Sequence, residues 1–137
     1  MKSRDTLIRL KRFQVDEKRR RVAQIEMMIA DFERMAAELE AEITLEEKKA
    51  GITDLGHFAY PTYAKAAAQR RDNLLQSAHN LKGELNEAQE ELAEAYEELK
   101  KVEILEDRER NAERVAAGAR EQAVMDEIGL ARAVRPR

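Results

Sequence analysis

Histidines and carboxylates are the residues of this chain best suited to catalysis or metal binding. The two histidines, His57 and His79, lie about two dozen residues apart and share no ligand spacing. Adjacent glutamates such as Glu90 and Glu91 have the spacing of a solvated helix face, and the chain has neither cysteine nor a glycine-rich phosphate loop. Because catalysis needs convergent groups in a water-poor site, we expect no enzyme, no bound metal and no cofactor.

Basic residues near the start of the chain are the next chemical feature. The run from Lys18 to Arg21, together with Arg9, Lys11 and Arg12, could bind phosphates. Residues 84–109, however, hold eleven acidic residues against three basic ones and are expected to lie beside this run. Pairing within the chain then explains the basic run, so we expect no nucleic acid partner. The helix that carries this basic run has only a narrow apolar stripe, which disfavours binding to a membrane surface. No apolar run reaches the ~20 residues of a membrane span, so we expect no direct membrane insertion either.

Apolar residues recur at every seventh position and predict the elements that carry these groups. One series comprises Ile8, Val15, Val22, Ile29, Ala36 and Ile43. A second series comprises Leu74, Leu81, Ala88, Ala95 and Val102, with a parallel row of Ala78, Leu85, Leu92 and Leu99. A strict period of seven keeps one helix face toward a partner helix and indicates supercoiled helices. We therefore predict an all-α fold, a long two-helix antiparallel coiled-coil hairpin with a C-terminal overhang on the second helix.

Charge blocks along the chain independently favour antiparallel pairing. Residues 1–21 hold nine basic residues against three acidic ones, and 22–60 hold three against nine. Residues 61–83 hold four basic residues against one acidic residue. When the chain folds back between Gly51 and Pro61, paired residue numbers sum to about 110 and blocks of opposite sign face each other. Flanking charges of this kind set orientation in coiled coils.

The break between the heptad series predicts the loop of the hairpin. We expect helix one at about 3–49, the tip at 50–61, helix two at about 62–128 and a frayed tail at 129–137, all in a single domain. Gly51 suits the end of helix one, while Pro61 suits the start of helix two. The tail is basic, and it includes Arg132, Arg135, Pro136 and Arg137.

Three of the six aromatic residues, Phe58, Tyr60 and Tyr63, lie in or beside the tip. In one interpretation the rings plug the end of the coiled coil. In the other they form an aromatic docking knob, because aromatic side chains anchor interfaces. Both interpretations can hold at once.

The opening segment and the tip resemble a known family. Residues 4–26 read RDTLIRLKRFQVDEKRRRVAQIE, and residues 57–65 read HFAYPTYAK. With the single break and the long second helix, these segments resemble FliJ-type flagellar export proteins over essentially the whole chain. The resemblance implies a cytoplasmic component of type III export, peripherally associated with the export apparatus at the inner membrane. It also implies an antiparallel coiled coil similar to the stalk subunit of rotary ATPases.

The resemblance further implies three partners: the hexameric flagellar export ATPase, the export-gate membrane protein and the export chaperones. The end that holds both chain termini would enter the ATPase ring. We expect the ATPase contact at seven arginines, namely Arg9, Arg12, Arg19, Arg20, Arg110, Arg114 and Arg120. We expect the gate contact at Phe58, Tyr60 and Tyr63. The chain alone is expected to be monomeric.

Two alternatives share the same architecture. A generic structural coiled coil would use the same heptad positions to self-associate, whereas an intramolecular hairpin stays monomeric on dilution. The stalk protein of an injectisome-type secretion system would share the stalk role.

Overall fold

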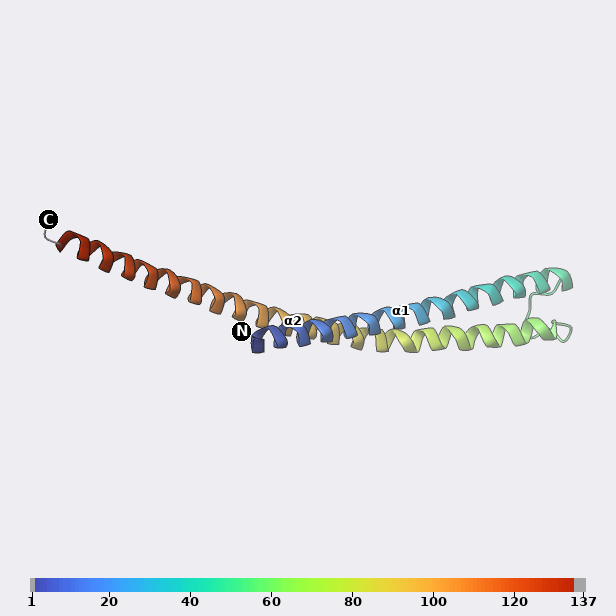
Figure 1. Cartoon of the computed structure of the whole chain (residues 1–137). Helices are drawn as coiled ribbons and strands as arrows, with labels where there is room; N and C mark the ends of the chain where they lie inside the picture. The colour runs from blue at the N-terminus through green and yellow to red at the C-terminus, as the bar shows by residue number, and fades with distance from the viewer. Residues whose placement is uncertain (1, 135–137) are drawn as a thin grey trace. The chain divides into compact units, whose positions relative to one another are not determined.

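The chain is a hairpin of two long helices (Figure 1). The computed structural model describes residues 2–134, and their side chains from Ser3 onward. Helix α1 spans Lys2–Ala50 and helix α2 spans Thr62–Val134, and the described residues contain no strand. The predicted all-α helical hairpin is confirmed. It divides into two compact units, the terminal unit (Met1–Phe13 with Tyr96–Arg137) and the loop unit (Gln14–Ala95).

The loop unit contains the main apolar contacts between the helices. Its largest fully buried side chain is Ile25, which is 1% exposed and lies in a cluster with four other buried residues. These are Val22, Ile29, Ala78 and Ala88. A second cluster joins Ile43 to Ala67 and Ala68. Large side chains on α1 thus face small ones on α2, which lets the two helices approach closely.

The predicted heptad positions lie at the helix contact in both units. All six residues of the α1 series are buried, and every residue of the two α2 rows is buried or half-buried. In the terminal unit, however, Ile8 is the only buried residue among those described. The period of seven therefore predicted the contacting faces correctly, although the apolar burial is concentrated in the loop unit.

Ion pairs follow the predicted charge blocks within each unit. In the terminal unit Arg4 pairs with Glu109 at 2.5 Å, and Lys11 pairs with Glu98 at 2.9 Å. In the loop unit the cross-helix pairs are Lys18–Glu91, Lys82–Glu33 and Arg71–Glu40. In both units earlier α1 residues meet later α2 residues, as antiparallel helices require.

The ends of the helices beside the loop are fixed by backbone geometry. Gly51 has a φ of 73°, and its N–H donates to the Glu47 carbonyl at 2.9 Å, which ends α1 in the left-handed conformation that glycine adopts without strain. The Pro61 carbonyl accepts the first helical hydrogen bond of α2, from the Lys65 N–H at 3.0 Å. Proline has no N–H to leave unpaired, so it suits this position.

The far end of α2 differs from the predicted boundary. Helix two was expected to end near residue 128, but α2 continues to Val134 and includes Arg132 in its last turn. A lone Gly129 costs a helix only about 1 kcal/mol, which does not end it. Arg135, Pro136 and Arg137 lie outside the described residues.

Candidate functional site

A concavity lined by three arginines lies in the terminal unit. Arg9 and Arg12 enter it from α1 and Arg110 enters it from α2, with Asp5, Ile8 and Glu106 completing the lining. Arg9 and Arg12 share one face of α1 because residues three apart are neighbours on a helix. The buried Ile8 side chain fixes that face against α2. The helix pairing therefore brings Arg110 beside two arginines that lie about a hundred residues earlier in the sequence.

The three guanidinium groups differ in their partners. The Arg110 side chain donates to a Glu106 carboxylate oxygen at 2.6 Å, and the Glu106 side chain is only 14% exposed. Arg9 and Arg12 are exposed, and neither has an ion pair with any residue that the structure describes. An incoming carboxylate or phosphate could therefore pair with both arginines without breaking an existing bond. The chemistry of this arrangement is that of charge pairing, because two exposed guanidinium groups lie beside the carboxyl groups of Asp5 and Glu106.

Neighbouring ion pairs hold the helices together at this site. The Arg4 side chain contacts both Glu109 and Glu113, and its hydrogen bond to Glu113 is the main reason that its pKa is raised. On the other side of the concavity, Lys11 donates to Glu98 and lowers the pKa of that carboxyl group. These contacts keep α1 against α2 where only Ile8 is buried.

The other predicted arginines do not join this group. Arg114 bonds the side chain of Asn111 at 2.9 Å, and Arg120 lies further along α2. Arg19 and Arg20 belong to the loop unit, where Arg19 lies 3.8 Å from Asp16. Two residues that line the concavity, Asp5 and Glu106, were not among the site residues predicted from the sequence. Both stand four residues before an arginine, a spacing that could have indicated them.

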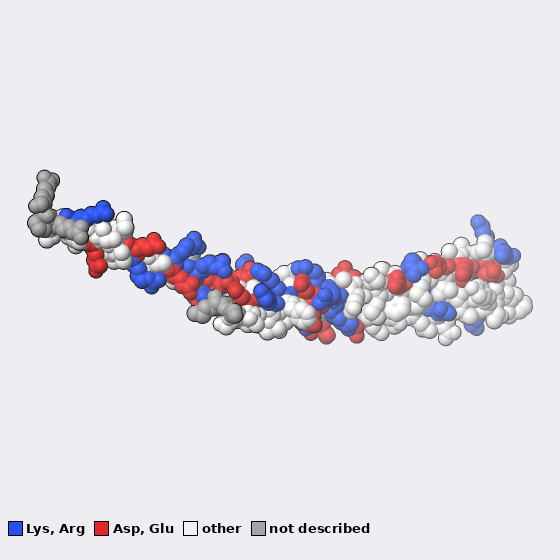
Figure 2. Space-filling model, in the orientation of Figure 1, with Lys and Arg blue, Asp and Glu red and all other residues white. Residues whose placement is uncertain are grey.

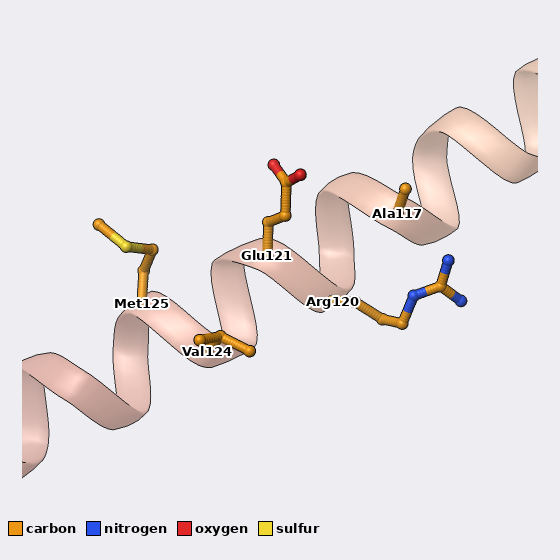
Figure 3. Close-up of a pocket in the computed structure, with 5 residues that line it drawn as sticks. All are labelled: Ala117, Arg120, Glu121, Val124 and Met125. Atoms are coloured by element: carbon orange, nitrogen blue, oxygen red, sulfur yellow. The ribbon is translucent and has the colours of Figure 1, made fainter.

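The part of α2 beyond Glu113 has no α1 side chain bonded to it in the described range. Five of its residues line a shallow hollow: Ala117, Arg120, Glu121, Val124 and Met125 (Figure 3). All five project from α2, and no described residue of α1 lines the hollow. Val124 is 54% exposed and Met125 is 65% exposed. This segment, 114–134, therefore presents uncovered apolar side chains in the same unit as the arginine concavity.

The three aromatic residues predicted at the tip differ in their exposure and in their contacts. Tyr60 is 8% exposed, and burial followed by its contact with Glu47 raises its pKa. Tyr63 is 57% exposed and donates its hydroxyl to Glu42 at 2.7 Å, which raises its pKa as well. Phe58 is 96% exposed. Tyr60 thus plugs the hairpin, while Phe58 projects into solvent.

The described residues contain no group of three or more histidine, cysteine or acidic side chains placed to hold a metal ion. Across the same part of the chain, neither helix contains a stretch apolar enough to cross a bilayer.

Comparison with known proteins gives one result. A family model described as "Flagellar FliJ protein" matches residues 1–137, which is the whole chain. No curated protein and no solved structure matches the chain significantly.

Proposed function

This chain belongs to the family of flagellar FliJ proteins, and on that basis we propose that it acts as a coiled-coil stalk and adaptor in flagellar type III protein export. In this proposal it binds the hexameric export ATPase and links it to the export gate and the export chaperones. It acts in the cytoplasm, peripherally associated with the export apparatus at the inner membrane, and catalyses no reaction itself. The observation that carries the proposal is the family match over the full length.

The terminal unit is the proposed ATPase-binding end. Two of its features support this assignment, the unpaired Arg9 and Arg12 side chains and the uncovered apolar segment 114–134. Unpaired arginines can meet carboxylates of a partner, and exposed apolar side chains gain free energy when a partner buries them. Neither feature is needed to hold the hairpin together. Both are therefore available for an intermolecular contact.

Co-sedimentation with purified flagellar export ATPase tests the proposal, with ATP turnover measured in the same samples. We expect binding and faster turnover with the full chain. Arg12→Glu should weaken both, more strongly at low salt, because screening reduces exposed charge contacts. The matched control is Arg70→Glu, which makes the same change at an exposed position of the loop unit. An absence of binding at both low and moderate salt would contradict the stalk assignment.

Deletion of residues 117–137 gives a second test of the same end. Ile8 and the ion pairs of Arg4 lie before the deletion, so the hairpin should keep its melting temperature apart from the lost helix. The ATPase contact should weaken if segment 114–134 contributes to it.

The oligomeric state separates this proposal from a generic self-associating coiled coil. The heptad positions of α1 and α2 bury one another within a single chain. We therefore expect a monomer whose mass does not change on dilution. Sedimentation velocity measures this directly. A dimer that persists at the lowest measurable concentration would favour the generic coiled coil.

A further inference from the structure

The loop of the hairpin holds a phenyl ring almost entirely in water. Phe58 is 96% exposed, and its neighbour Leu55 is 51% exposed. The ring of His57 stacks on that of Phe58, with the ring centroids 4.7 Å apart and an angle of 21° between the planes. Phe58 therefore contributes little to the hairpin core. Exposure of a large apolar side chain to water is unfavourable, and its burial by a partner protein would be favourable.

The loop that carries Phe58 is held by its own hydrogen bonds. The Asp54 carboxylate accepts the Gly56 N–H at 3.0 Å, and the Asp54 carbonyl accepts the His57 N–H at 3.1 Å. The His57 ring nitrogen Nδ1 accepts the Ala59 N–H, and the His57 carbonyl accepts the Tyr60 N–H, both at 3.0 Å. The buried Tyr60 side chain then anchors the loop to the helices. A partner that binds Phe58 pays little additional ordering cost, since the loop is already organised.

Charge distinguishes this surface from the rest of the chain. From Ala50 to Tyr63 the only charged residue is Asp54, in a chain that is 39% charged. The Asp54 carboxylate already accepts a backbone N–H. Figure 2 shows a visible face that is largely white toward the loop, with one acidic band and a few separate basic groups. Interfaces between proteins have charge-depleted, aromatic-rich centres, whereas phosphate and anionic lipid surfaces attract clustered cations.

We propose that the loop is a docking site whose anchor is Phe58, inserted into an uncharged apolar pocket of a partner protein. The lack of charge on the loop is matched by a pocket without charge. This inference rests on the proposed function in taking that partner to be the cytosolic domain of the export gate. The predicted gate contact of three aromatic residues is thereby reduced to Phe58, because Tyr60 and Tyr63 make their contacts within the hairpin.

Binding of the full chain to the purified gate domain tests this inference. We expect Phe58→Ala to weaken binding about 30-fold or more, the effect of removing an interface anchor. Its melting temperature should equal that of the parent. Phe13→Ala is the matched control, because it removes another exposed phenyl ring, 54% exposed and in the terminal unit, and it should leave gate binding unchanged. Since the contact is apolar, the affinity of the parent should change little between low and high salt.

The outcomes separate the inference from the function on which it rests. If the parent binds and Phe58→Ala binds equally well, the docking site is wrong while the stalk function stands. If the parent does not bind the gate domain, both the gate contact and the docking site are wrong, whereas ATPase binding is unaffected. Binding to anionic vesicles that Phe58→Ala abolishes would instead make a membrane the occupant and overturn the proposal. If the parent dimerises with rising concentration and Phe58→Ala does not, a second copy of this chain covers Phe58, and the proposal is overturned.

Discussion

Replacement of Ile25 by alanine is the sharpest test of the helix contact. Ile25 is 1% exposed and lies at the centre of the cluster with Val22, Ile29, Ala78 and Ala88. Isoleucine-to-alanine changes in cores cost about 2–5 kcal/mol, the loss growing with the cavity that remains. Here half-buried neighbours such as Phe32 and Leu85 border solvent and can move into the space. We therefore expect a loss in the lower half of that range, about 2–3 kcal/mol.

The measurement for this variant must report on the loop unit alone. The two units have different cores, so a single helicity signal can combine two transitions. Urea-dependent hydrogen exchange read on peptides from residues 14–95 gives the free energy of opening for that unit. Met28→Ala is the control, because Met28 is 43% exposed three residues along the same helix, and it should change stability by about 0.5 kcal/mol or less. Equal losses for the two variants would refute the assignment of Ile25 to the core.

Two other predictions concern a glycine and an ion pair. Gly83 lies inside α2, and a Cβ there would meet no atom within 4 Å. Gly83→Ala should therefore raise the stability of the loop unit by up to about 1 kcal/mol, measured by the same exchange experiment. A loss of stability would show that the glycine is needed for packing. The pKa of Glu98 is lowered by Lys11, so this pair stabilises the folded chain above the unfolded pKa of about 4.3 and the contribution is lost as the pH falls through the lower folded value. The gap in urea midpoint between the parent and Lys11→Gln should therefore be present at pH 6 and close near pH 2, and a gap of the same size at both would contradict the pairing.

The helix contact could be predicted from sequence because its cause is periodic. Ile8 to Ile43 recur every seven residues, and packing two helices along a line requires such recurrence. The charge blocks predicted the pairing in the same way, since Lys11–Glu98 and Arg71–Glu40 have residue numbers that sum to about 110. Both signals come from many residues at once, so single exceptions do not hide them.

The loop and the terminal unit could be predicted only in part. The exposure of Phe58 depends on hydrogen bonds made by Asp54 and His57, and no periodic pattern encodes them. The arginine concavity depends on which α2 residue lies opposite Arg9 and Arg12, a register that blocks of charge do not specify to one residue. The extension of α2 to Val134 goes beyond the predicted end near residue 128, since one glycine at position 129 costs a helix only about 1 kcal/mol.

The uneven burial of the two units has a mechanical consequence. The loop unit is closed by two apolar clusters, whereas the described part of the terminal unit has Ile8 and salt-sensitive pairs such as Arg4–Glu109. Local opening is cheapest where few apolar side chains are buried, and salt screens exposed pairs further. The hairpin therefore unzips from its termini and keeps its loop closed. The first turns of α1 can therefore separate from α2 while the two apolar clusters of the loop unit stay closed.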